Sequence, residues 1–212
     1  GGTGMRTAIS VVADALNDST PELVAGPTAY RLAGGALVRV WQRTDRPDGF
    51  ASVGNFDDDP QAEIVVVTDG SVYMLNHDGS DAGVWNPPTG SPVVRAGRGQ
   101  GGTALIADVD GDGRPEIGIA GAERFVLLNR DGTERWSSVI SDRSSNSTGS
   151  VAFDLDGDGT LEIIYRDETY LRIYRDHDGL LLAKTPVQSA TWGEIPVVAD
   201  VDNDGHADVV VS

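Results

Sequence analysis

A nine-residue pattern that recurs five times constrains this chain more than any other feature of its sequence. Four of the five copies place an oxygen-bearing side chain at positions 1, 3, 5 and 9, and an apolar run precedes and follows each copy. A repeat of this period indicates an array of similar units, so fold and function have to be derived from one unit. The windows are Asp14–Glu22, Asn55–Glu63, Asp108–Glu116, Asp154–Glu162 and Asp200–Asp208.

The negative charge of the chain is concentrated in these windows. The 212 residues include 33 acidic and 16 basic side chains, for a net charge of −17, and the windows hold 19 of the acids but a single base, Arg114. The rest of the chain is therefore nearly neutral. Because Lys and Arg form no basic stripe, the sequence argues against nucleic acid as a partner.

Each unit has the pattern of four consecutive strands. One short β-branched run enters the window and a second leaves it, both as expected of strands buried on both faces. A third strand follows. In three units the third run ends in an Asp-Gly pair, at residues 78–79, 131–132 and 178–179, which is a strong hairpin signal. A fourth strand is then predicted around Trp41, Trp85, Trp136 and Leu180–Leu182.

Four strands in an up-and-down meander form the blade of a β-propeller. The first residues of the windows lie 41, 53, 46 and 46 residues apart, which suits propeller repeats, and the Gly/Pro-rich stretch 86–102 explains the longest interval. We therefore expect an all-β chain, a β-propeller of four-stranded antiparallel blades. About four and a half blades are predicted, at residues 5–44, 45–100, 101–146, 147–192 and, in part, 193–212.

A propeller that stops within a blade is not expected to close by itself. Closed propellers have roughly four to eight complete blades. We therefore expect this chain to be part of a seven- or eight-bladed propeller, completed by further blades or by another chain.

Each window can form a cage for a hard cation. Side chains at positions 1, 3 and 5 of a tight loop can converge with the carbonyl of position 7 and the carboxylate of position 9, and Ca²⁺ takes about six to eight oxygen ligands. So many carboxylates favour Ca²⁺ over Mg²⁺, and the absence of His or Cys side-chain ligands argues against zinc and copper. Gly113, Gly159 and Gly205 stand at position 6, where the chain must turn sharply.

We expect about three to four Ca²⁺ ions, held by the four intact windows. The position-7 residues Gln61, Arg114, Thr160 and His206 would contribute their carbonyl oxygens. The first window has Leu16 at position 3 and is expected to be empty, although the sequence does not decide this. The other candidate ligands are Asn55, Asp57, Asp59, Glu63, Asp108, Asp110, Asp112, Glu116, Asp154, Asp156, Asp158, Glu162, Asp200, Asp202, Asp204 and Asp208.

Two simpler interpretations of the windows were weighed. An EF-hand needs a Glu at position 12 and a following helix, but Ile119, Tyr165 and Val211 stand there within strand-like sequence. Plain Asp/Gly turns would explain one isolated window, since both residues favour turns. Four windows in one register weaken that explanation.

The segments DVDGDGRPEIGIAG, DLDGDGTLEIIY and DVDNDGHADVVVS resemble the FG-GAP/VCBS repeats of integrin-α-like β-propellers, and the resemblance covers essentially the whole chain. It implies Ca²⁺ bound between the first two strands of a blade, which we carry over to the four intact loops only. Glu at position 9 in three of these loops departs from the usual Asp of the family. The Phe-Gly…Gly-Ala-Pro signature of integrins is not clearly present, so integrin-like ligand binding is not implied.

The tryptophans are assigned mainly to packing. Trp41, Trp85 and Trp136 recur at one place in the unit and are predicted to pack between blades. Trp192 lies outside this pattern, in the loop 188–194, and is the candidate for a ligand contact.

Taken together, the sequence predicts a calcium-binding extracellular β-propeller that is secreted, on the cell surface or periplasmic. It would act as a non-enzymatic module for recognition, adhesion or structure, with a glycan or protein ligand at the variable loops 86–102, 142–150 and 188–194. Neither a Gly-x-Ser-x-Gly nor a His-Glu-x-x-His motif is present, although the many carboxylates leave an acid pair for glycoside hydrolysis open. No apolar stretch is long enough to span a membrane. The alternative is the propeller of a secreted polysaccharide lyase, similar to rhamnogalacturonan lyases.

Overall fold

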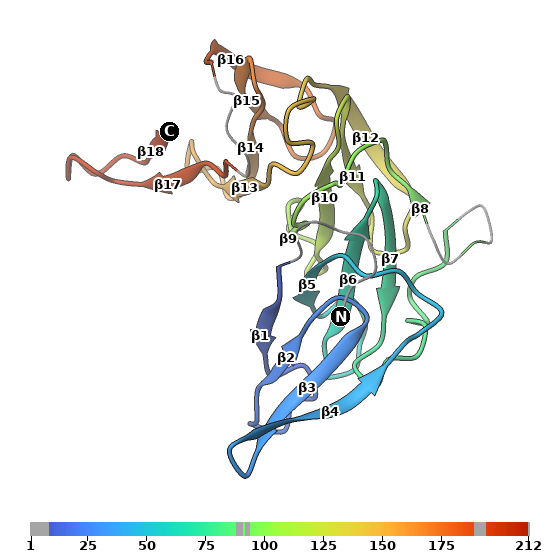
Figure 1. The fold of residues 1–212 in the computed structure, drawn as a ribbon. Helices are drawn as coiled ribbons and strands as arrows, with labels where there is room; N and C mark the ends of the chain where they lie inside the picture. The colour runs from blue at the N-terminus through green and yellow to red at the C-terminus, as the bar shows by residue number, and fades with distance from the viewer. Residues whose placement is uncertain (1–8, 88–90, 92–93, 189–193, 212) are drawn as a thin grey trace.

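The computed structural model describes residues 9–87, 91, 94–188 and 194–211. In these residues every regular element is a β-strand, and the strands form four antiparallel sheets of four strands and one of two strands. Strands that are consecutive in sequence pair with each other in every sheet, so each sheet is an up-and-down meander (Figure 1). The prediction of an all-β chain built from propeller blades is confirmed.

The strands of the first two sheets are β1 (Val11–Ala13), β2 (Glu22–Val24), β3 (Thr28–Ala33) and β4 (Ala36–Gln42), and then β5 (Phe50–Gly54), β6 (Glu63–Thr68), β7 (Ser71–Leu75) and β8 (Val94–Arg95). Those of the third and fourth are β9 (Leu105–Ala107), β10 (Glu116–Ala120), β11 (Arg124–Leu128) and β12 (Glu134–Val139), and then β13 (Ser150–Phe153), β14 (Glu162–Arg166), β15 (Tyr170–Tyr174) and β16 (Leu181–Pro186). The two-stranded sheet contains β17 (Val197–Ala199) and β18 (Asp208–Val210).

The sheets follow one another in an open arc (Figure 1). The first strand of each sheet contacts the first strand of the next, so that β1, β5, β9, β13 and β17 form its inner edge. The hydrophobic cores lie between neighbouring sheets. One core joins Val65 and Val67 of β6 to Ile117 and Ile119 of β10, and two others join the first sheet to the second and the third to the fourth.

The second strand of each of the three central sheets is the most buried element. Every residue of β6, β10 and β14 is buried. This is the environment that continuous β-branched runs predict, because both faces of the strand lie against neighbouring sheets. The same prediction is wrong for the first strands, since no residue of β1, β9, β13 or β17 is buried at the inner edge of the arc. The second strands also begin with the position-9 acid of each window, earlier than the apolar runs alone indicate.

Tryptophan packing between blades is confirmed by contacts with hairpin glycines of the next sheet. A Cβ atom added to Gly79 would lie 2.8 Å from the ring of Trp41, and one added to Gly179 would lie 2.5 Å from the ring of Trp136. Both indoles also donate a hydrogen bond to a backbone carbonyl of that hairpin: Trp41 at 2.7 Å and Trp136 at 2.6 Å. Trp85 packs in the same way over Gly132.

The fourth strand of the second sheet is not where the sequence placed it. Trp85 is buried but lies outside any strand, and its amide closes a turn onto the carbonyl of Ala82 at 3.2 Å. Two prolines follow it in the sequence, at positions 87 and 88, and neither can donate to a ladder. The outer strand is instead the two-residue β8, within the stretch that we expected to be an inserted loop.

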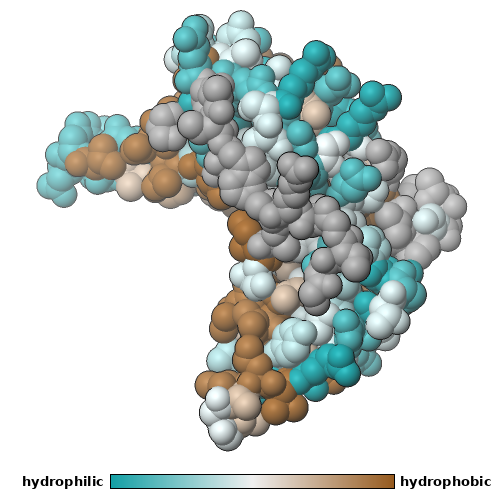
Figure 2. All heavy atoms as spheres, in the orientation of Figure 1, coloured by the Kyte–Doolittle hydropathy of each residue, from teal (hydrophilic) through white to brown (hydrophobic). Residues whose placement is uncertain are grey.

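The first and last sheets expose several apolar side chains. Val12, Leu37 and Val38 are exposed in the first sheet, and Val197 and Val210 in the last. Figure 2 shows hydrophobic surface on both of these ends of the arc. The described part of the chain contains no helix long and apolar enough to cross a membrane.

The packing of tryptophan on glycine predicts an asymmetric response to alanine. Gly35 and Gly179 both lie in hairpins with positive φ, at 81° and 69°, but open space surrounds Gly35 whereas Trp136 covers Gly179. We expect Gly35→Ala to cost about 1 kcal/mol of unfolding free energy, from backbone strain alone. Gly179→Ala should cost about 1–3 kcal/mol more, because the indole must move. Denaturant unfolding of both variants measures the difference, and equal losses would contradict this packing.

Candidate metal centres

The acidic windows, numbered loops 1 to 5 in chain order, connect the first two strands of each sheet. In every loop the residue just before position 1 pairs with the position-9 acid in the antiparallel ladder, as Gly54 does with Glu63 and Ala199 with Asp208. The ladder therefore fixes both ends of each loop. The position-9 carboxylate belongs to a strand, so its backbone cannot move away from the loop without breaking the sheet.

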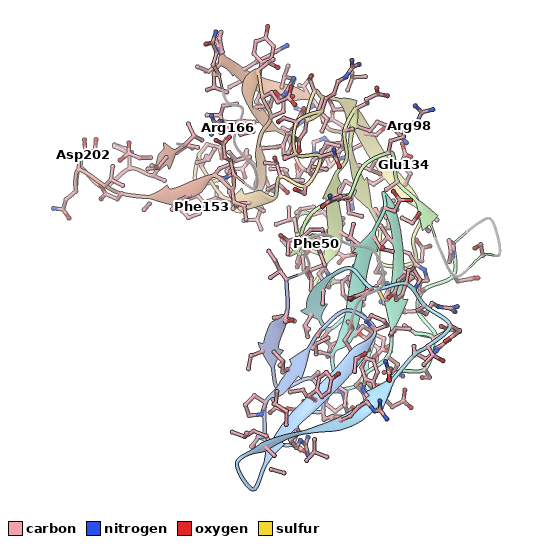
Figure 3. All side chains as sticks on the ribbon, viewed as in Figure 1. Phe50, Arg98, Glu134, Phe153, Arg166 and Asp202 are labelled. Atoms are coloured by element: carbon pink, nitrogen blue, oxygen red, sulfur yellow. The ribbon has the colours of Figure 1, made fainter. Side chains whose placement is uncertain are left out.

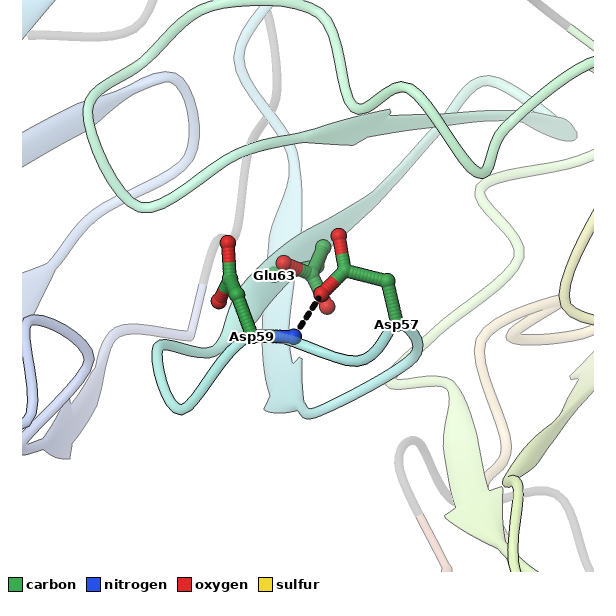
Figure 4. A group of neighbouring side chains, drawn as sticks. All are labelled: Asp57, Asp59 and Glu63. Atoms are coloured by element: carbon green, nitrogen blue, oxygen red, sulfur yellow. Dashed lines mark hydrogen bonds between the residues drawn. The ribbon is translucent and has the colours of Figure 1, made fainter.

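Each of loops 2 to 5 brings three carboxylates together. One oxygen from each of three acidic side chains can be chosen so that all lie within 4.8 Å of one another. Figure 4 shows the group in loop 2, where Asp57, Asp59 and Glu63 point toward a common space. The other groups are Asp108, Asp110 and Glu116; Asp154, Asp156 and Glu162; and Asp200, Asp202 and Asp208. Asp202 lies at the tip of the last hairpin, away from the other sheets (Figure 3).

Loops 3 to 5 owe their shape to left-handed residues at positions 4 and 6. The glycines at position 6, Gly113, Gly159 and Gly205, have φ of 86°, 91° and 88°, as expected from the sequence. The position-1 carboxylate accepts the amides of positions 5 and 6, for example Asp108 from Asp112 at 3.1 Å and from Gly113 at 2.9 Å. These hydrogen bonds fold the backbone of the loop around the position-1 carboxylate.

Position 5 has a structural contact in each of the four candidate loops. Its Oδ1 accepts the amide of position 7 at 2.8–2.9 Å, from Gln61, Arg114, Thr160 and His206 in turn. Loop 2 differs from the others because position 1 is Asn55, whose side-chain amide donates to the carbonyl of Asp59 at 2.7 Å. The close group in loop 2 is accordingly formed by positions 3, 5 and 9, and in loops 3 to 5 by positions 1, 3 and 9.

The position-9 glutamates are buried carboxylates. Glu63 is 0 % exposed, and its Oε2 accepts the amide of Phe56 at 2.7 Å. Its Oε1 is buried and has no hydrogen-bond partner among the described residues. The pKa of Glu63 is raised to about 7, mainly by burial and also by the charges of Asp57 and Asp59. A buried carboxylate with a free oxygen, facing two others, is a site that a hard cation fits.

Loops 3 and 4 repeat this electrostatic pattern. The pKa of Glu116 is also raised to about 7, mainly by burial, although Arg135 opposes the shift. Burial likewise raises the pKa of Glu162, with the charge of Asp156 adding to it. Each position-9 glutamate again accepts the amide of position 2, at 3.1 Å in loop 3 and 2.8 Å in loop 4. A buried glutamate with a raised pKa is thus common to loops 2, 3 and 4.

Two arginines near these loops have roles that the sequence analysis did not anticipate. Arg114 was considered only for its carbonyl, yet its guanidinium crosses to loop 2 and contacts the carbonyl of Asp57 and the carboxylate of Asp58. Arg135 on β12 donates to Asp110 at 2.6 Å, and its Nη1 lies 3.7 Å from Glu116. Neither contact has a local sequence signal, because both depend on how strands and sheets lie side by side.

The loops predicted to meet a ligand are described only in part. Trp192 lies outside the described residues, as does most of its loop. The loop 142–150 is held from within by Asp142, which is 1 % exposed and accepts the hydroxyl of Ser145 at 2.7 Å and the amides of Ser147 and Thr148 at 3.1 Å each.

Comparison with known proteins gives a family match and several structural matches. The family described as FG-GAP-like repeat matches residues 55–119, 108–165 and 154–211. No curated protein matches the chain. The V. cholerae biofilm matrix protein Bap1 is similar in structure, with a TM-score of 0.76 and 15% identity over 95% of this chain.

Two further structures share the architecture at similar distance. A lectin from Agrocybe aegerita that recognises non-reducing terminal N-acetylglucosamine has a TM-score of 0.55 and 17% identity over 96% of this chain. BamB from Moraxella catarrhalis has a TM-score of 0.51 and 14% identity over 91%. The chain spans only 59%, 60% and 55% of the Bap1, lectin and BamB chains. At these identities the matches establish the fold.

Neutralising Glu63 is predicted to have opposite effects with and without calcium. At pH 8 this carboxyl is ionised in the folded protein, because its pKa of about 7 is exceeded, and the cost of burying the charge is fully present. Gln keeps an acceptor for the Phe56 amide, so Glu63→Gln should raise the unfolding free energy in chelator by roughly 1–3 kcal/mol. In millimolar calcium it should lower the melting temperature, because a ligand is lost.

Melting curves in both buffers test whether the effect of Glu63→Gln on stability changes sign between chelator and calcium. Glu123→Gln is the control, since Glu123 is exposed and the described part of the chain gives it one ion pair, with Arg143 at 3.4 Å. A loss of stability for Glu63→Gln of equal size in the two buffers would contradict the assignment of Glu63 as a ligand.

Proposed function

The chain belongs to the family of FG-GAP-like repeat proteins, and on that premise we propose that loops 2 to 5 bind Ca²⁺ and that the propeller acts outside the cytoplasm as a non-enzymatic recognition or structural module. The observation that carries the calcium part is the buried, partnerless oxygen of Glu63 within a group of three carboxylates. Three further groups repeat the arrangement at the same point of the fold.

Calcium would be held by the four loops through the side chains at positions 1, 3, 5 and 9 and the carbonyl at position 7. The ion supplies positive charge where the chain places three or four acids together. Because position 9 begins the second strand and position 1 follows the first, cation binding links these two strands. Its binding free energy then contributes to folding. Extracellular calcium modules bind with dissociation constants on the order of 10⁻⁴–10⁻³ M. Loops with such an affinity would fill only where calcium reaches that concentration, and we therefore place the protein outside the cytoplasm.

The exposed apolar ends of the arc support a larger propeller. Val12 and Val38 in the first sheet and Val197 and Val210 in the last lie on sheets that have a neighbour on one side only among the described residues. Three of the four boundaries between neighbouring sheets are filled by hydrophobic cores. Further blades, of this protein or of another chain, would cover these ends, in keeping with the seven or eight blades expected from the sequence.

A glycan is the ligand class that the surface favours. A cavity of about 490 Å³ lies at the boundary of the second and third sheets, and the proposed calcium ligands Asp112 and Glu116 of loop 3 form part of its lining. Asn86, Asn129, Arg130 and Asp131 contribute polar groups to it, and side-chain amides, guanidinium and carboxylate groups can hydrogen-bond the hydroxyls of a sugar. Trp192 remains a second candidate contact. The similarity to a lectin is consistent with glycan binding but shows only the shared fold.

Removing calcium should destabilise the protein strongly. Chelation leaves four clusters of repelling carboxylates, so the melting temperature should fall by many degrees in EGTA and recover when calcium is returned. Asp156→Ala removes one ligand of one loop and should reproduce only part of the loss. Differential scanning calorimetry measures both effects, and an unchanged melt in excess chelator would exclude metal-dependent stability.

Glycan binding is tested with a glycan array in calcium, followed by titration of the best ligand. Asn86→Ala and Arg130→Ala should each weaken binding by roughly tenfold or more, because each removes a hydrogen-bonding group from the cavity. Asn86 is exposed, so its variant should melt like the wild type. Unchanged affinity in both variants would show that the glycan does not bind in this cavity. Turnover of pectic polymers by the protein would instead favour the lyase alternative.

A further inference from the structure

Loop 1 has the backbone shape of the candidate metal loops although its sequence differs. Its residues at positions 4 and 6, Asn17 and Ser19, have φ of 52° and 69°. The corresponding residues of loop 5, Asn203 and Gly205, have φ of 62° and 88°. Ser19 therefore adopts a conformation that L-residues rarely take, at the position where three other loops have glycine. Something in loop 1 holds this shape.

The hydrogen bonds around position 1 are also conserved in loop 1. Asp14 accepts the amides of Asp18 and Ser19 at 3.0 and 2.8 Å. Asp200 of loop 5 accepts the equivalent two amides at 3.1 and 3.0 Å. Loop 1 is thus curled around its acids in the same way, although Leu16 supplies no carboxylate at position 3.

The difference is a guanidinium group between the acids of loop 1. Arg31 on β3 pairs with Glu22 across the β2–β3 ladder. Its Nε donates to Oε1 of Glu22 at 2.9 Å, and its Nη2 contacts both Glu22 and Oδ2 of Asp18, the latter at 2.9 Å. Glu22 is 1 % exposed, so Arg31 provides the positive charge that a buried carboxylate requires.

Among the described residues, no arginine contacts the position-9 acid of loop 2 or loop 4. In loop 2, Ile64 pairs with Leu75, so the residue that follows Leu75 and lies opposite Glu63 is Asn76. In loop 4 the equivalent residue is Arg175, but its guanidinium is turned to Asp178, with Nε donating at 3.0 Å.

Loop 3 is the intermediate case. Arg135 reaches it from β12 and contacts Asp110, and Glu116 is more distant from the guanidinium. Among the five described loops, loop 1 is the one in which a single guanidinium bridges the acids at positions 5 and 9. It is also the one whose acids do not form a close group of three.

We infer that Arg31 is the built-in cation of loop 1: its guanidinium bridges Asp18 and Glu22 in place of a metal ion, so that the first blade folds without calcium. The comparison with loops 2 to 5 rests on the calcium binding proposed above. The consequence is a chain with four calcium-dependent blades and one that keeps its loop closed when calcium is scarce. Low calcium would then loosen the propeller from loop 2 onward and leave the first sheet intact.

Hydrogen exchange of the full chain, in calcium and in EGTA, tests this directly. In the wild type, residues 14–24 should exchange at the same rate in both buffers, whereas residues 55–63 and 154–162 should exchange faster in EGTA. Arg31→Met should speed exchange of residues 14–24 in EGTA by roughly tenfold or more, because it leaves Glu22 buried and unpaired. Arg39→Met is the control, since the side chain of Arg39 bonds only Gln42 among the described residues.

Two outcomes would overturn the inference. One is faster exchange of wild-type residues 14–24 in EGTA, matching the other loops. The other is an Arg31→Met variant that exchanges like Arg39→Met. If no segment responds to EGTA, the proposed calcium binding fails, and the Arg31→Met comparison still decides whether the arginine holds loop 1.

Calcium stoichiometry provides a second, independent test. Wild-type protein should bind four ions, and Leu16→Asp combined with Arg31→Asn should bind one more, because it supplies the position-3 acid and removes the competing guanidinium. Leu16→Asp alone, which keeps Arg31, should leave the count unchanged. The inference would be contradicted if the folded double variant bound no additional ion. It would also be contradicted if the single variant Asp14→Asn bound one ion fewer than the wild type. If the double variant does not fold, the hydrogen-exchange comparison of Arg31→Met with Arg39→Met decides whether the arginine holds loop 1.

Discussion

A carboxylate at the start of the second strand, buried in the first four blades, is the constraint on which the rest of the unit depends. In loops 2 to 4 the position-9 glutamate is at most 5 % exposed and accepts the amide of position 2. Burying an ionised carboxylate is costly unless a positive charge lies next to it. The acids that surround it increase that cost, so the loop is stable only when a cation, or a proton, compensates the charge. Arg31 provides the compensation in loop 1, and calcium is our proposal for the others.

This arrangement explains why the acids cluster in a chain that is otherwise nearly neutral. Each acidic loop places its charge at one end of a blade, where the loop connects the first two strands. Packing between blades uses different groups, on the outer strands and hairpin of the unit, where an indole of one sheet covers a hairpin glycine of the next. The two devices are independent, because one closes a blade and the other joins blades. Both recur with the repeat, as expected of an array whose units contact only their neighbours.

The sequence predicted the fold class, the windows and the buried second strands well, because each rests on a local pattern repeated several times. It was less accurate for the outer strands. β4 and β16 are almost entirely exposed, so no hydrophobic alternation marks their bounds. β8 lies beyond a proline-rich turn, and Trp85 therefore misled the prediction. The contact of Arg31 with Glu22 depends on strand register, and that of Arg114 with loop 2 depends on the alignment of two sheets, so neither pattern could be recognised locally.

The central claim is that cations occupy the acidic loops at the roots of the blades. A crystal structure of the protein grown in millimolar calcium, with anomalous scattering data, tests this most directly. The account predicts anomalous peaks bounded by the carboxylates of loops 2, 3, 4 and 5, and in loop 1 the guanidinium of Arg31 with no peak. Ordered protein with no peaks in the four acidic loops, despite ample calcium, would contradict it.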